Sequence, residues 1–173
     1  MAPTRKPEIE TADLAPMMLD LSAWGERDPA RLTWLTPPPT GHVAQAIRLL
    51  EMLDAVDSNG KLTPHGKELS RMPCHPRMAQ MMVAAETPAL KRLAADLAAT
   101  LEEKDPLARP QGETQPGADI SLRVEALRRY RQRPQGAGRV WARIAKIADQ
   151  YMKMGRLAEP DNGPFSPTDA GLL

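Results

Sequence analysis

The stretch LDAVDSNGKLTPHGKELSRMPCHP, residues 53–76, interrupts a chain whose other patterns are helical. Within it, Asn59-Gly60 predicts a tight hairpin, because both residues tolerate the positive φ angles that a type I′ turn requires. Residues 55–58 and 61–63 would form its two short antiparallel arms. The stretch therefore predicts a small β-hairpin inside a helical chain.

Helices are expected on both sides of this hairpin. Thr63-Pro64 is typical of a helix start and predicts a helix to about residue 72. Upstream, apolar residues recur at steps of three and four in two runs, one ended by Gly25 and one capped by Thr40. The runs are Leu14, Met17, Met18, Leu21 and Trp24, and then Val43, Ala46, Ile47, Leu50 and Leu53. Helix, helix, hairpin and helix form the pattern of a winged helix; the alternative is a decorative hairpin on a helical bundle.

The second half of the chain predicts a bundle of helices joined by short turns. Helix starts are expected at Pro76, at Thr87-Pro88 and at Asp119, with a Pro- and Gly-rich exposed loop over residues 105–117. The last long helix ends at Gly155. Its predicted buried face is Val140, Ile144, Ile147, Tyr151 and Met154.

Composition excludes several classes of protein. Cys74 is the only cysteine among 173 residues, so neither an intrachain disulfide nor a thiolate-rich zinc site can form. His65 and His75 lack a suitably spaced further ligand, and we expect no metal site. No apolar run is long enough to span a membrane and no secretory signal is present, which favours the cytoplasm.

Positive charge is concentrated in residues 121–156, which hold ten Lys or Arg and two acids. The segment is therefore +8, whereas the remainder of the chain is −7. On its last helix, five polar residues follow steps of four and three and form one stripe about 100° from the predicted apolar face. They are Arg139, Arg143, Lys146, Gln150 and Lys153.

Such a row of cations suits the phosphates of a nucleic acid, although an ordinary solvated face is the alternative. The arginines of the preceding helix belong to the same candidate site but make no single surface. Tyr130 and Trp141 could stack on bases, whereas Tyr151 is expected in the core. The arginines concerned are Arg123, Arg128, Arg129, Arg131 and Arg133.

A search for catalytic motifs returns none. The chain has no phosphate-binding loop, no HExxH and no nucleophile elbow. Glu102, Glu103 and Asp105 are the densest acids, but they lie near a helix end without convergent partners. The chain by itself is expected to catalyse nothing and to hold no cofactor.

Three ordered stretches over residues 7–107 resemble a known family. They are PEIETADLAPMMLDLSAWGERDP, LTWLTPPPTGHVAQAIRLLEMLDAVDSNGKLTPHGKELSRMPCHPRMAQMM and LAATLEEKDPL, and the run of LTPHG followed by MPCHPRMAQMM is the most specific part. They look like the region after the motor domains of DEAH-box ATP-dependent helicases, specifically the bacterial HrpB type.

The resemblance implies a linker over residues 1–12, a winged-helix domain over residues 13–75 and a ratchet-like helical domain over residues 76–173. The wing would lie at Asn59-Gly60 and make protein contacts. Because family members continue further, the ratchet-like domain is expected to be incomplete at Leu173. Both domains would pack on RecA-like motor domains, which bind ATP and Mg²⁺, and would help to close the channel for single-stranded nucleic acid.

The favoured function is thus a non-catalytic accessory region of a nucleic-acid helicase. One alternative is a winged-helix regulator of double-stranded DNA, whose recognition helix over residues 67–72 would carry only Lys67 and Arg71 as cations. Another is a pure protein-docking module. Nothing in the pattern separates RNA from DNA.

Overall fold

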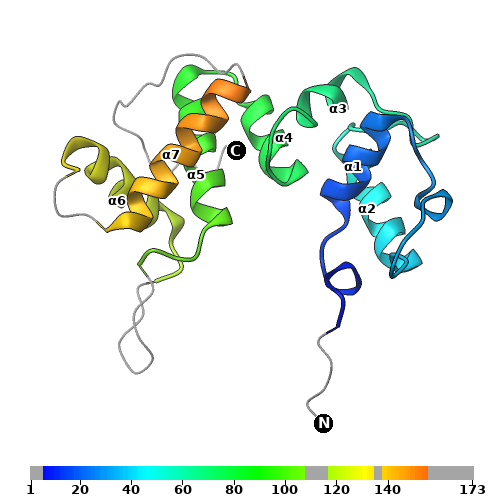
Figure 1. Cartoon of the computed structure of the whole chain (residues 1–173). Helices are drawn as coiled ribbons and strands as arrows, with labels where there is room; N and C mark the ends of the chain where they lie inside the picture. Colours follow the sequence, from blue (N-terminus) through cyan, green and yellow to red (C-terminus); the bar gives the residue numbers. More distant parts are fainter. Residues whose placement is uncertain (1–5, 108–116, 135–137, 156–173) are drawn as a thin grey trace, which may run out of the picture. The chain divides into compact units, whose positions relative to one another are not determined.

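The computed structural model describes residues 6–107, 117–134 and 138–155 (Figure 1). Within them the chain forms seven α-helices and two short 3-10 helices, and β-structure is limited to one isolated bridge. This confirms the mainly helical fold predicted from the sequence. Residues 108–116, which form most of the exposed loop expected over residues 105–117, lie outside the described residues.

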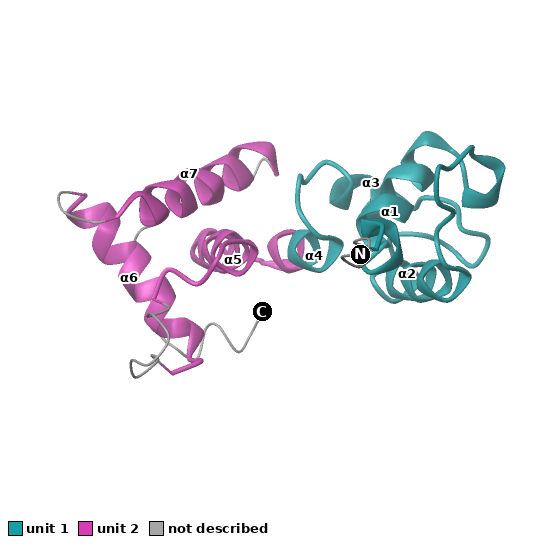
Figure 2. Cartoon of the chain, turned by 60° about the horizontal axis from the view of Figure 1, so that its bottom comes forward, with its two compact units in different colours: residues 1–80 teal, residues 81–173 magenta. Residues whose placement is uncertain are grey.

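The chain divides into two compact units (Figure 2). Unit 1 comprises residues 1–80 and unit 2 comprises residues 81–173, so that the division falls within helix α4 (Pro76–Ala84). None of the helices that the structure describes is long and apolar enough to cross a bilayer.

Unit 1 has the order of elements that its sequence predicts. Gly25 ends α1 in the left-handed region, with φ of +90°. Three expectations are wrong. Trp24 is 81% exposed rather than buried, and Thr40 is the first residue of its helix rather than the N-cap. The helix that begins after Thr63 ends at Leu69 rather than at about residue 72. The elements are η1 (Glu8–Glu10), α1 (Ala15–Trp24), η2 (Pro29–Arg31), α2 (Thr40–Met52), α3 (Pro64–Leu69) and the start of α4.

The wing is a hairpin of different geometry from the one predicted. Asn59 does not adopt positive φ, which rules out the type I′ turn, whereas Gly60 does, at +70°. The turn is closed instead by the Gly60 N–H, which donates to the Asp57 carbonyl, and the Asp57 N–H donates to the Lys61 carbonyl. This is a turn followed by a left-handed glycine, the common three-residue hairpin loop. The arms share one antiparallel bridge, between residues 56 and 62.

The side chain of Asp57 stabilises this turn. One of its carboxylate oxygens accepts hydrogen bonds from the backbone N–H groups of Asn59 and Lys61, both at 2.9 Å. The bond from the Lys61 N–H is the main reason why the pKa of Asp57 lies below its usual range. The sequence signal of Asn59-Gly60 therefore locates the wing correctly, but Asp57 and Gly60 determine its shape.

Unit 2 is built on a central helix, α5 (Pro88–Glu102). Residues 92–100 of α5 are all buried, and the helix contacts both α6 (Ile120–Gln132) and α7 (Arg139–Met154), which also contact each other. The predicted caps are confirmed, because Thr87 accepts from the Leu90 N–H and Asp119 accepts from the Ser121 N–H. These three helices determine where every charged side chain of the candidate site lies.

Candidate nucleic-acid interface

Helix α7 has a buried face and a basic face on opposite sides. At about 100° per residue, the two sets are centred roughly 180° apart. The buried residues are Ile144, Ala145, Ala148, Tyr151 and Met152. We call the exposed set the basic stripe, and it consists of Arg139, Arg143, Lys146, Gln150 and Lys153.

The apolar face predicted for α7 is wrong in position. Val140 and Met154 are 38% and 44% exposed, whereas Ala145 and Ala148 are buried. Small side chains let two helices approach closely, and α5 likewise buries four alanines. The helix therefore turns Ala145 and Ala148 inward, and the basic stripe lies opposite the core rather than about 100° from it.

Three cations of the basic stripe make no ion pair within the described part of the chain. Arg139, Lys146 and Lys153 are each exposed and lie seven residues apart. The rise between successive members is about 10 Å. Arg143 differs from them, because its guanidinium pairs with Glu103, the residue after α5. The stripe thus presents three unpaired charges and one paired charge.

The arginines of α6 do not join this surface as a group. Arg129 is exposed and lies 3.3 Å from the carboxylate of Glu125, one turn earlier. Arg133 is exposed and Arg128 is half-buried. Arg123 and Arg131 turn inward, with side chains that are 8% and 15% exposed.

Arg123 ties the start of α6 to the segment after α5. Its guanidinium contacts the Asp105 carboxylate at 2.6 Å and also donates to the carbonyls of Gly117 and Asp119. The hydrogen bond from Arg123 is the largest cause that holds the pKa of Asp105 below its usual range, and the bond from the Leu107 N–H adds to it. The same pair raises the pKa of Arg123. This arginine therefore has a structural role.

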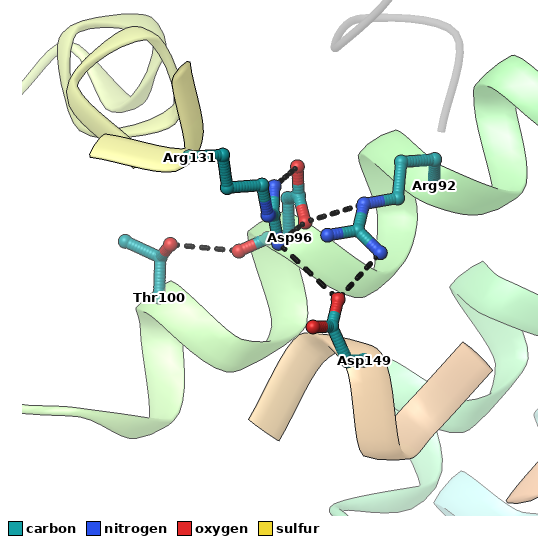
Figure 3. Close-up of polar contacts among 5 residues, drawn as sticks. All are labelled: Arg92, Asp96, Thr100, Arg131 and Asp149. Carbon is teal, nitrogen blue, oxygen red and sulfur yellow. Dashed lines mark hydrogen bonds and ion pairs between the residues drawn. The ribbon is translucent and has the colours of Figure 1, made fainter. Parts of the chain in front are cut away.

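Arg131 belongs to a buried ionic network that joins all three helices of unit 2 (Figure 3). It donates two parallel hydrogen bonds of 2.8 Å to Asp96 of α5, whose side chain is 0% exposed. Arg92, also in α5, lies 2.8 Å from Asp149 of α7. Two arginines and two aspartates neutralise one another there.

One contact within this network is not a hydrogen bond. The Nε of Arg92 lies 3.2 Å from Asp96 Oδ1, but it is not directed along a hydrogen bond. That contact is therefore a charge interaction only. This network was not predicted from the sequence, although one signal was available: Arg92 and Asp96 lie four residues apart and are separated only by Leu93, Ala94 and Ala95.

The three acids near the end of α5 have partners that the sequence did not reveal. Tyr151 of α7 donates from its hydroxyl to Glu102, and Glu103 and Asp105 pair with arginines as described above. These carboxylates attach α6 and α7 to the end of α5. Tyr151 is 3% exposed, which confirms its predicted place in the core, whereas Tyr130 and Trp141 are half-buried.

The two histidines that were considered as metal ligands make protein contacts within unit 1. His65 Nε2 hydrogen-bonds the side chain of Gln80, and His75 Nε2 lies 3.1 Å from the carboxylate of Asp13. Among the residues that the structure describes, no cluster of three His, Cys, Asp or Glu could hold a metal ion.

Comparisons with known proteins agree on one family. Residues 46–74 match a family model described as helicase associated domain (HA2), winged-helix. Over 98 residues the chain is 38% identical to the ATP-dependent RNA helicase HrpB of Escherichia coli (strain K12). This match covers 57% of this chain and 12% of that protein. It is 33% identical over 114 residues to HrpA of the same organism, covering 63% of this chain and 9% of that protein.

The comparison of folds identifies the same relative as the comparison of sequences. Two crystal structures of Escherichia coli HrpB superpose with TM-scores of 0.68 and 0.69 at 25% and 27% identity, and each match covers 91% of this chain. The chain spans 17% of those structures and about a tenth of the curated relatives. By sequence and by fold, this chain is similar to the helicase-associated region of HrpB-type DEAH-box helicases.

Proposed function

We propose that the chain is a non-catalytic accessory region of an ATP-dependent nucleic-acid helicase, in which the basic stripe lines part of the path of a single strand. The observation that carries this proposal is the row of Arg139, Lys146 and Lys153, exposed on the face of α7 opposite the core and without acidic partners among the described residues. Cations in this state release counterions when they bind phosphates.

The expected grip is independent of base sequence. Contacts to phosphates position a strand but carry no sequence information. The HrpB and HrpA relatives are named RNA helicases, so RNA is the first strand to test. ATP and Mg²⁺ would belong to RecA-like motor domains of the same polypeptide, because this sequence contains no phosphate-binding loop. The cytoplasmic location expected from the sequence belongs to the same proposal.

Unit 1 has a surface that suits a protein partner such as a motor domain. Trp24, Leu35 and Met52 are 81%, 104% and 82% exposed. An open groove of about 620 Å³ has a lining that includes Trp34, Val43 and several prolines. A groove with an apolar lining is a common site for a protein partner, whereas apolar residues exposed singly are normal. This supports packing of unit 1 against a motor domain.

Fluorescence anisotropy with labelled single-stranded RNA and DNA tests the nucleic-acid proposal. Two triple variants of the full chain are compared at several salt concentrations. One reverses the unpaired cations of the stripe, Arg139→Glu, Lys146→Glu and Lys153→Glu. The other makes the same change in charge on unit 1, with Arg48→Glu, Lys67→Glu and Arg71→Glu. We expect the first variant to lose at least tenfold in affinity and the second to lose much less.

The same comparison separates the alternatives. Helix α3 has only six residues and ends before Arg71, which makes it a poor recognition helix for a major groove. A regulator of double-stranded DNA would bind a duplex in preference to single strands and would lose that binding in the unit 1 variant. Equal losses in both variants would contradict a site on α7.

A further inference from the structure

We infer that Glu103 attenuates the grip of the basic stripe by neutralising Arg143, and that removing this one carboxylate strengthens binding of a single-stranded nucleic acid. The inference rests on the proposed function of α7. The sequence had suggested no partner for Glu103. The inference assigns to this residue control of the affinity for a single strand.

The geometry places the carboxylate inside the binding surface. Arg143 lies four residues after Arg139 and three before Lys146, between two of the unpaired cations. Its guanidinium pairs with Glu103, and the two side chains are 61% and 14% exposed. A phosphate that approached the exposed part of Arg143 would therefore also approach the negative charge of the half-buried Glu103.

Glu103 is held in place by its neighbour in the chain. Glu102 accepts the hydroxyl hydrogen bond of Tyr151, a core residue of α7. The end of α5 is thus attached to α7 at two points, Arg143 and Tyr151, which lie about two helical turns apart. Because Tyr151 is a core residue, its bond to Glu102 keeps the end of α5 against α7, and the Glu103 carboxylate stays beside Arg143 when a strand arrives.

The electrostatic consequence is a limit on affinity. Binding at Arg143 must either share the guanidinium with Glu103 or break the pair, and the repulsion between carboxylate and phosphate opposes both. Single strands are then held by three cations rather than four. Limited affinity suits a surface along which a strand has to move, since each contact must also be released.

The test is the variant Glu103→Gln in the full chain, with Glu125→Gln as its matched control. Both remove one acid that pairs with an arginine, but Glu125 pairs with Arg129 on α6, outside the stripe. The amide oxygen of the introduced glutamine can still accept from Arg143, so the arginine keeps its place. Affinity for a labelled single-stranded RNA oligomer is measured by anisotropy between 50 and 200 mM salt, the interval over which phosphate contacts are strongly salt-dependent.

We expect Glu103→Gln to bind roughly fivefold more tightly at low salt, the factor that one close charge interaction in water corresponds to. The slope of log K against log salt should steepen by about 0.7, one additional phosphate contact. Glu125→Gln should stay within about twofold of the original chain. Adding Arg143→Gln to Glu103→Gln should abolish the gain, whereas Arg143→Gln alone should weaken binding, because it leaves the Glu103 carboxylate without its cation.

Different outcomes separate this inference from the proposed function. Equal affinities of Glu103→Gln and Glu125→Gln, with the stripe triple variant still defective, would overturn the role of Glu103 only. That role would also be overturned if Glu103→Gln kept its gain in affinity after Arg143→Gln was added. If the stripe triple variant binds normally, both the proposed interface and the inference are wrong. Unchanged thermal unfolding of Glu103→Gln excludes a folding defect as the cause.

Discussion

Gly66 in helix α3 lies where no side chain fits. A Cβ atom there would be 1.9 Å from the carbonyl oxygen of Ala55 and 2.7 Å from its carbonyl carbon. Both atoms belong to the backbone of the hairpin, so relief requires the helix or the hairpin to move. We expect Gly66→Ala to destabilise the chain by about 2–4 kcal/mol, as measured by urea denaturation.

The matched control for this substitution is Gly41→Ala in the first turn of α2. An added Cβ meets nothing within 4 Å there, and the helical backbone accepts alanine. Gly41→Ala should therefore be neutral or stabilise by about 0.5–1 kcal/mol. Similar effects of the two substitutions would show that helix α3 does not approach the hairpin closely.

In the motif LTPHG, residues 62–66, the roles of Thr63 and Pro64 could be predicted from the sequence, whereas the role of Gly66 could not. Thr63 and Pro64 act locally, and their roles as N-cap and first helical residue were predictable and are confirmed. The need for glycine at position 66 depends on a segment eleven residues earlier in the chain, the carbonyl of Ala55. Local pattern could not show that approach, because it arises only when the hairpin folds onto the helix.

The Asp105–Arg123 pair predicts a specific acid dependence. The pKa of Asp105 is lowered in the folded chain, first by its bond from Arg123. A lowered carboxyl pKa adds stability above the unfolded value of about 3.9, and this stability is lost as the pH falls through the folded value. Asp105→Asn should thus destabilise by about 1 kcal/mol at pH 7, a modest amount because this carboxylate is 40% exposed.

Urea denaturation from pH 7 to pH 3 checks the sign. The difference between the original chain and Asp105→Asn should be constant above about pH 5 and shrink below about pH 4. Asp20→Asn is the control, because Asp20 is exposed and makes no hydrogen bond or ion pair in the described residues. A difference for Asp105→Asn that does not change with pH would assign the loss to packing rather than to charge.

At the scale of elements, the buried network decides how α5, α6 and α7 fit together. Removing one partner of a buried ion pair leaves an uncompensated charge, which costs about 3–5 kcal/mol. Asp96→Asn would leave Arg92 and Arg131 with Asp149 as the one remaining acid of the network. We expect a loss of that size, with a lower thermal midpoint followed by circular dichroism.

Glu125→Gln is again the informative comparison, because it breaks an exposed pair on the same helix as Arg131. The side chain of Arg129 is 77% exposed, so the expected change is below about 0.5 kcal/mol. A small effect of Asp96→Asn would mean that water enters the network and solvates its arginines.

Helix starts were predicted well because their signals are local. The face that a helix buries was predicted less well, because packing against other helices determines it. Helix starts at Thr63, Thr87 and Asp119 followed from capping chemistry. The buried face of α7 did not, because hydrophobicity favoured valine and methionine while the close contact with α5 selected alanine. Of the candidate site, the stripe on α7 was visible in the spacing of its charges. The pairing of Arg123, Arg131 and Arg143 was not, since their partners lie far away in the sequence.

At the scale of the whole molecule, the net charge of +8 in residues 121–156 does not measure how much positive charge reaches the surface. The arginines of this segment are drawn partly into the core and partly into surface pairs, so a net charge overstates the positive surface. The described cations that remain unpaired in this segment include the three of the stripe and Arg133. Binding through the stripe alone would give a slope of log K against log salt of about −2 for single strands.

The remaining prediction concerns the chain as a whole: it should not hydrolyse nucleotides. Nothing in its sequence provides the backbone cradle and lysine that bind the phosphates of ATP. We therefore expect the purified chain to release no phosphate from ATP or other nucleotides, with or without RNA, in a phosphate-release assay. Escherichia coli HrpB serves as the positive control. Turnover that follows the chain through size-exclusion chromatography would contradict an accessory role, because hydrolysis would then need no separate motor domain.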